Sequence, residues 1–223
     1  MTAARNPLKY KHILFDLDGT LTDPKEGITN AIIHSLTKMD IEAPDNDALI
    51  HFIGPPLKDS FEADYGLTDD KNAQAILYYR EYFADIGLFE NRVYDGIEKL
   101  LMDLKSRGAL LYVATSKPVD YARQILVHFN LSQYFEMIAG SELDGTRNHK
   151  AEVIQYVIEQ NNLQAKNCVM IGDRKHDLIG ADMNNMDAIG VLYGYGSEEE
   201  LSSHPHIALV RTIDALNRYL ITS

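Results

Sequence analysis

The sequence predicts an α/β fold: a doubly wound parallel sheet with helices on both faces, and a helical domain inserted after the first strand. Two observations carry this prediction. From residue 91 onward, short apolar runs alternate with segments of helical periodicity, whereas residues 24–90 contain helical periodicity alone. Alternation of strands and helices is typical of a parallel sheet. We therefore expect an α/β core of residues 1–23 and 91–223, and a helical cap domain of residues 24–90.

The expected core elements follow in order along the chain. Short apolar runs with polar flanks predict strands at residues 12–16, 109–115, 135–140, 168–173 and 187–193. Apolar residues at helical spacing predict helices at residues 94–108, 119–129, 150–160, 177–185 and 212–221. Ser197 and Glu200 have the spacing of a capping box, so they are expected to open one more helix.

The inserted segment starts with a strong helix signal. Asp23 is expected to cap a helix over residues 24–39 that has Pro24 at its first position. Residues 72–86 show the same helical spacing, and the Gly-Pro-Pro-Leu sequence at 54–57 breaks the pattern between the two helices.

Composition limits the classes of function. No stretch approaches the ~20 apolar residues of a membrane span and the N-terminus lacks a signal-peptide pattern, so we expect a cytoplasmic protein without a membrane partner. Cys168 is the only cysteine, which excludes an intrachain disulfide. The net charge of −12 disfavours binding of a nucleic-acid polymer. An anionic substrate therefore needs local positive charge or a bound cation. No pattern in the sequence predicts an oligomeric state.

Polar residues gather where the expected strands end, and parallel sheets bind ligands at that edge. These residues are Asp16 and Asp18 after the first strand, Thr115, Ser116 and Lys117 after the second, Asp173 after the fourth, and Lys150 at the start of a helix. Asp16 and Asp18 are two residues apart, so both can face one crevice, and Gly19 permits a sharp turn. Asp16 and Asp18 can share a metal with Asp173, because three carboxylates around one point need a cation, and Mg²⁺ suits such oxygen ligands.

The motifs resemble those of the haloacid dehalogenase superfamily. They are Asp16-Leu17-Asp18-Gly19-Thr20, then Thr115, then Lys150, then Gly172-Asp173 with Asp177 four residues on. The helical block after the first motif resembles the cap of the phosphoglycolate phosphatase-like branch, so the likeness covers essentially the whole chain. One departure is Ala151, which stands where relatives often have proline after the lysine.

This resemblance implies a magnesium-dependent phosphatase that hydrolyses a small phosphate monoester. As in the family, Asp16 would be the nucleophile that forms an aspartyl-phosphate. Asp18 would protonate the leaving alcohol and later take a proton from water. Mg²⁺ would be held by Asp16, the backbone carbonyl of Asp18, and Asp173, with Asp177 in support.

The same resemblance assigns the phosphate contacts. Gly19, Thr115 and Ser116 would lie against the phosphate oxygens beside Asp16, and Lys150 would balance their charge. Cap residues select the leaving group in this family, which makes Lys58 and Arg80 candidates for substrate specificity. Either can equally face outward, an orientation that we favour for Arg80.

Several functions remain open at this stage. The leading one is a phosphoglycolate phosphatase-like activity, with a 5′-nucleotidase, a sugar-phosphate phosphatase or a phosphomutase of the same superfamily as alternatives. A phospho-accepting receiver module is the alternative of another class, although it needs neither Asp18 nor a cap. Cys168 and Arg174 match the spacing of cysteine-dependent phosphatases, but the run between them is a buried-strand pattern. We therefore expect Cys168 in the core and Arg174, Lys175 and His176 on a solvated loop.

Overall fold

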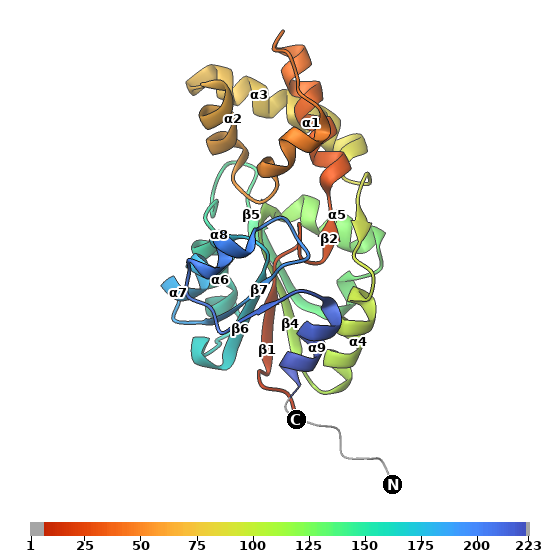
Figure 1. Ribbon diagram of the computed structural model, residues 1–223, viewed down its shortest axis with the longest axis vertical. Helices are drawn as coiled ribbons and strands as arrows, with labels where there is room; N and C mark the ends of the chain where they lie inside the picture. The colour runs from red at the N-terminus through yellow and green to blue at the C-terminus, as the bar shows by residue number, and fades with distance from the viewer. Residues whose placement is uncertain (1–6, 222–223) are drawn as a thin grey trace.

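A six-stranded parallel sheet forms the core of the computed structural model, which describes residues 7–221 (Figure 1). The strands lie in the order β5-β4-β1-β6-β7-β8. Their bounds are β1 His12–Phe15, β4 Leu110–Pro118, β5 Phe135–Ser141, β6 Cys168–Gly172, β7 Asp187–Val191 and β8 Ala208–Val210. The predicted α/β class with a doubly wound parallel sheet is confirmed, and β8 is a strand beyond those expected.

Helices cover both faces of the sheet because side chains alternate along each strand. Ile13 and Phe15 of β1 pack into one apolar cluster, whereas Leu14 packs into the other. The first cluster includes residues of α4 Ile97–Ser106, α5 Val119–His128 and α9 Ile213–Leu220. The second includes residues of α6 Lys150–Gln160, α7 Lys175–Met183 and α8 Glu198–Ser202. Two short 3₁₀ turns, η3 Ser132–Tyr134 and η4 Ala165–Asn167, precede β5 and β6.

The inserted helical segment lies beyond one end of the sheet, at the top of Figure 1. It contains α1 Lys25–Lys38, the 3₁₀ helix η1 Asn46–Phe52, α2 Leu57–Tyr65, α3 Asp69–Tyr82 and the π-helix η2 Phe83–Gly87. Where the chain enters and leaves this segment, β2 Thr22–Asp23 and β3 Arg92–Val93 pair antiparallel. These two-residue strands were not expected. Within residues 7–221, no helix is both long and apolar enough to cross a membrane.

Asp23 holds this junction together. Helix α1 begins at Lys25, so Pro24 stands at the cap position and not at the first helical position as expected. Asp23 does accept a hydrogen bond from the Lys25 backbone N–H at 3.2 Å, but it also accepts one from Arg92 Nε at 2.9 Å and one from the Tyr195 hydroxyl. Burial alone would raise the pKa of Asp23, yet these hydrogen bonds outweigh it and lower the pKa.

The loop after β6 differs from expectation. Helix α7 begins at Lys175, two residues early, and the Arg174 side chain is only 12% exposed. The expected solvated loop is therefore wrong for Arg174. Ser197 caps α8 by accepting a hydrogen bond from the Glu200 backbone N–H at 3.0 Å. The Glu200 carboxylate instead accepts hydrogen bonds from Arg174 and from the backbone of Lys175.

Candidate active site

Strand register brings the polar strand ends to one edge of the sheet. Phe15 of β1 lies opposite Val113 of β4 on one side and Ile171 of β6 on the other. The backbone N–H of Asp16 continues the ladder by donating to the Ile171 carbonyl at 2.9 Å. The residues just beyond this aligned register are therefore neighbours: those after β1 and β6, and Thr115 to Lys117, which belong to β4 because it runs on to Pro118.

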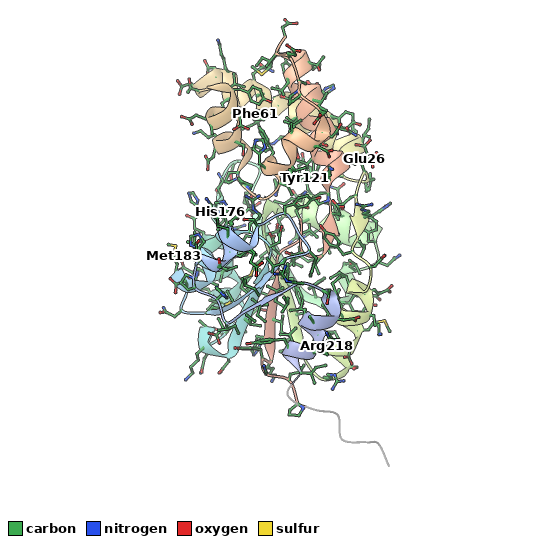
Figure 2. All side chains as sticks on the ribbon, in the orientation of Figure 1. Glu26, Phe61, Tyr121, His176, Met183 and Arg218 are labelled. Atoms are coloured by element: carbon green, nitrogen blue, oxygen red, sulfur yellow. The ribbon has the colours of Figure 1, made fainter. Side chains whose placement is uncertain are left out.

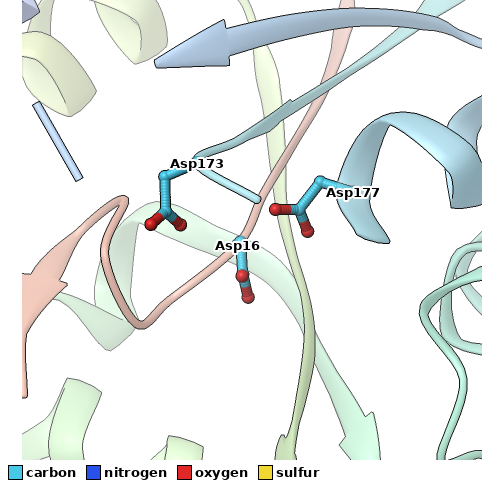
Figure 3. A group of neighbouring side chains, drawn as sticks. All are labelled: Asp16, Asp173 and Asp177. Carbon is cyan, nitrogen blue, oxygen red and sulfur yellow. The ribbon is translucent and has the colours of Figure 1, made fainter. Parts of the chain in front are cut away.

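A buried cluster of three carboxylates lies at this edge. Asp16, Asp173 and Asp177 each bring one carboxylate oxygen within 4.8 Å of the others. Figure 3 shows Asp173 and Asp177 approaching Asp16 from two sides, from the loop after β6 and the start of α7. Burial, with the nearby charges of Asp177 and Asp16, raises the pKa of Asp173 well above its ordinary value. The cluster thus carries more negative charge than its surroundings balance.

Lys150 balances part of that charge. Its Nζ lies 2.7 Å from Asp16 Oδ1 and 2.8 Å from Asp177 Oδ1, and it donates to the Ala114 carbonyl at 3.0 Å. Lys150 is the first residue of α6, so the helix holds its backbone in place while the side chain reaches across the edge of the sheet. Burial would lower the pKa of Lys150, but the two carboxylates outweigh burial and raise it. Lys150 is therefore protonated at neutral pH.

The Asp18 carboxylate was expected to share a metal with Asp16 and Asp173, but Asp177 takes the third place in the cluster, and Asp18 is paired with Lys117. Lys117 Nζ is 2.6 Å from Asp18 Oδ2, while the buried Oδ1 has no hydrogen-bond partner among the described residues. Burial raises the pKa of Asp18 in spite of Lys117. The sequence places Lys117 at the end of an expected strand but indicates no role for it. Its position two residues after Thr115 was the available signal.

The residues expected to contact phosphate differ in whether they are free to reach a ligand in the cavity. Thr115 and Ser116 line the same cavity as Asp16. Gly19 has a φ of +80°, and a Cβ there would lie 2.2 Å from an Asp173 carboxylate oxygen, so only glycine permits this approach. Its backbone N–H donates to the Thr22 carbonyl at 2.8 Å and is not free for a phosphate.

A cavity of about 580 Å³ lies between this edge and the helical segment. Asp16 and Asp18 line its core side, and four aromatic side chains also line it: Phe52, Tyr79, Phe83 and Tyr121. Tyr121 lies where the helical segment meets the core (Figure 2), and its ring centroid is 5.7 Å from that of Phe83. The cavity therefore offers both charged and flat apolar surfaces to a ligand.

Both cationic candidates of the helical segment reach this cavity. Lys58 lines it from α2 and Arg80 from α3. Arg80 Nη2 also donates to the Leu143 carbonyl of the core at 3.1 Å. The outward orientation that we favoured for Arg80 is thus not observed.

The carboxylate cluster fits a divalent cation that prefers oxygen ligands. Asp173 accepts hydrogen bonds from Thr20 Oγ1 at 3.2 Å and the Tyr195 backbone N–H at 2.8 Å. Among the described residues, however, no cationic side chain forms an ion pair with it. Buried carboxylates with raised pKa values are stabilised by a bound hard cation. Asp16, Asp173 and Asp177 are the residues placed to hold or support one.

Comparison with known proteins agrees with the fold and identifies the family. Residues 13–191 match the family model of the haloacid dehalogenase-like hydrolases. A 5′-nucleotidase from Pseudomonas aeruginosa is 50% identical over 96% of this chain and 96% of its own length. The tyrosine-protein kinase PtkA from Mycobacterium tuberculosis is 38% identical over 93% of this chain and 72% of its own.

A solved structure is similarly close. The crystal structure of a predicted phosphatase from Clostridium acetobutylicum has a TM-score of 0.92 and 50% identity, covering 94% of this chain and 97% of that one. The chain belongs to the haloacid dehalogenase-like hydrolases and is an enzyme of the phosphatase type within that family.

Proposed function

We propose that this chain is a magnesium-dependent phosphatase that hydrolyses a small phosphate monoester through an aspartyl-phosphate on Asp16. The observation that carries the proposal is the surroundings of Asp16. Its carboxylate lines the cavity, lies 2.7 Å from Lys150 and belongs to the three-carboxylate cluster. Lys150 on one side and a divalent cation held by the cluster on the other would supply the positive charge that allows a carboxylate to approach a phosphate dianion.

The first chemical step is attack of an Asp16 carboxylate oxygen on phosphorus, which breaks the bond to the ester oxygen. Asp18 lines the cavity beside Asp16 and gives its proton to the departing alcohol. In the second step water attacks the aspartyl-phosphate, Asp18 takes its proton, and Asp16 is released with inorganic phosphate. Both steps use the same two side chains, so the enzyme returns to its starting state.

Mg²⁺ would be held by Asp16, Asp173 and the backbone carbonyl of Asp18, with Asp177 in support. When bound, it offsets the negative charge of carboxylate and phosphate. Thr115 and Ser116 would donate hydrogen bonds to phosphate oxygens, and Lys150 would balance the charge that spreads over them.

The cavity favours a leaving group with a flat ring. Its volume of about 580 Å³ and four aromatic side chains suit a nucleoside better than the two-carbon phosphoglycolate. Similarity to a 5′-nucleotidase points the same way. We therefore propose nucleoside 5′-monophosphates as the first substrates to test, and phosphoglycolate as the second. We also propose that residues 24–90 act as the cap domain that selects between them.

Release of inorganic phosphate tests this proposal. A panel of ~100 phosphate monoesters is assayed with Mg²⁺ and with excess EDTA, and substrates are ranked by kcat/KM. The expected result is Mg²⁺-dependent turnover that Asp16→Asn abolishes and that Asp182→Asn, an exposed control on α7, retains. Transfer of the phosphoryl group to water, measured as released inorganic phosphate, distinguishes a phosphatase from a phosphomutase, a kinase or a receiver. Full activity in EDTA, or in Asp16→Asn, would overturn the proposal.

A further inference from the structure

We propose that Arg174 is a positioning residue for substrate selectivity: it fixes the loop of residues 53–58, here called the cavity loop, over the catalytic edge. The inference rests on the proposed phosphatase function, because selectivity is measured among phosphate monoesters. Gly54, Pro55, Pro56, Leu57 and Lys58 of this loop all line the cavity.

One guanidinium joins the core to the inserted segment. Arg174 directly follows Asp173, a member of the carboxylate cluster. Its Nη1 donates to the Ile53 carbonyl of the cavity loop, and its Nε donates to Glu200 Oε1 of α8 at 3.0 Å. The planar guanidinium allows both hydrogen bonds at once, which a lysine ammonium in a single position does not reproduce.

The core side of this bridge is held firmly. Glu200 Oε1 also accepts a hydrogen bond from the Lys175 backbone N–H at 2.9 Å, at the start of α7. The side chain of Glu200 is 21% exposed and that of Arg174 is 12% exposed. Since Glu200 Oε1 accepts hydrogen bonds from both the start of α7 and Arg174, the guanidinium is oriented by the core and the cavity loop is placed against it.

The loop side depends on Arg174 in two ways. Ile53 is fully buried, so loss of the arginine would leave its carbonyl without this hydrogen bond in an apolar site. Gly54 has a φ of +109°, and a Cβ there would come within 2.9 Å of Arg174 Cγ. The arginine stem thus packs directly on the glycine backbone.

Prolines make the cavity loop dependent on such outside support. Pro55 and Pro56 have no backbone N–H to donate within the loop. The next residues, Leu57 and Lys58, begin α2 and face the cavity. A shift of the loop therefore moves the surfaces that contact a leaving group, while Asp16 and Lys150 keep their places in the core. Such a shift changes the selectivity for the leaving group and leaves the reaction at phosphorus unchanged.

The test compares Arg174→Met with Arg211→Met, a matched control that breaks an exposed ion pair with Glu198 of the same helix α8. Arg174→Met is expected to lower kcat/KM for the preferred substrate ~10-fold or more, mainly through KM, because displacement of positioning groups is costly. Turnover of p-nitrophenyl phosphate should stay within about twofold of wild type. Arg174→Lys should not restore the preferred substrate, and Glu200→Gln should shift selectivity in the same direction but less.

Hydrogen–deuterium exchange gives a readout that does not need activity. The amides of Gly54, Leu57 and Lys58 should exchange faster in Arg174→Met than in wild type or Arg211→Met, with the sheet core unchanged. If the wild type hydrolyses no monoester, the proposed function fails, and loop exchange alone then decides the role of Arg174. Unchanged exchange and unchanged selectivity would overturn the inference. So would an equal loss on p-nitrophenyl phosphate and the preferred substrate, which would place Arg174 in the catalytic machinery.

Discussion

Lys117 Nζ lies 2.6 Å from Asp18 Oδ2 and 4.7 Å from the centroid of the Phe83 ring. Asp18 and Lys117 belong to the core, whereas Phe83 begins the π-helix of the inserted segment. The proposed general acid is therefore held by a cation that also packs against the proposed cap. Its orientation depends on both parts of the molecule.

Replacing Lys117 should impair proton delivery more than phosphate binding. We expect Lys117→Met to lower kcat ~10²-fold for alkyl phosphates, since a misplaced acid no longer protonates a poor leaving group. p-Nitrophenyl phosphate, whose leaving group needs little protonation, should lose far less. The measurement is kcat against leaving-group pKa, with Lys105→Met as control because Lys105 pairs with Glu136 on the surface. A uniform loss on every leaving group would instead indicate a phosphate-binding role.

Neutralising Asp173 should stabilise the metal-free protein and remove its response to Mg²⁺. The carboxylate is buried against Asp177 and Asp16, and its pKa is raised well above the ordinary value. Asn keeps the shape and can still accept a hydrogen bond from Tyr195. We expect Asp173→Asn to raise the metal-free Tm by ~2–4 °C, the shift typical of about 1 kcal/mol at this chain length. Mg²⁺ should raise the Tm of wild type and not of the variant.

The sign of the pH dependence follows from the same shift. An acid with a higher pKa in the folded than in the unfolded state destabilises folding above its unfolded pKa, about 3.9 for Asp. The penalty shrinks as pH falls toward that value. Metal-free wild type should therefore gain stability between about pH 7.5 and about pH 5, a range that lies above that pKa, and Asp173→Asn should gain less. Urea unfolding in EDTA measures the stability of wild type and of Asp173→Asn at each pH, and Asp182→Asn should behave as wild type does. An equal gain in stability in wild type and in Asp173→Asn would contradict the assignment of the raised pKa to Asp173.

Lys58 should affect the choice of substrate and not the chemistry. It lines the cavity from α2 and is not a member of the carboxylate cluster. We expect Lys58→Ala to change the ranking of monoesters by kcat/KM while leaving p-nitrophenyl phosphate nearly intact. Lys71→Ala, an exposed residue of α3, is the control. Equal losses on all substrates would place Lys58 in the catalytic machinery or in folding of the inserted segment.

The strand ends that carry the site could be predicted from the sequence, because the topology of a parallel sheet brings these positions together. Asp16 and Asp173 directly follow β1 and β6, and Lys150 begins α6, whose range agrees with expectation at residues 150–160. Parallel strands bring such positions together whatever lies between them in the chain. The three-residue strand β8 was missed because so short a run has no readable period.

Contacts between distant segments were beyond sequence reasoning. Arg174 bonds the carbonyl of Ile53, which lies 121 residues earlier, and nothing local to either residue signals the pairing. The ion pair of Asp18 and Lys117 likewise forms only after β1 and β4 align. Spacing predicts which residues reach the catalytic edge. Packing against the inserted segment decides how they are oriented once there.

A covalent intermediate on Asp16 distinguishes the proposed mechanism from direct attack by water on the substrate, and Asp18→Asn is the variant that exposes it. This change removes the group that activates water, so the intermediate should accumulate. p-Nitrophenyl phosphate keeps the first step fast without an acid. Asp16→Asn serves as the partner variant and should lose at least ~10³-fold in rate, about 4 kcal/mol of barrier.

The direct measurement is peptide mapping by mass spectrometry of Asp18→Asn quenched in acid during turnover with Mg²⁺. The predicted result is phosphate on Asp16 in this variant and none in Asp16→Asn. Phosphate on Cys168 or on a histidine, or normal turnover by Asp16→Asn, would rule out an aspartyl-phosphate on Asp16.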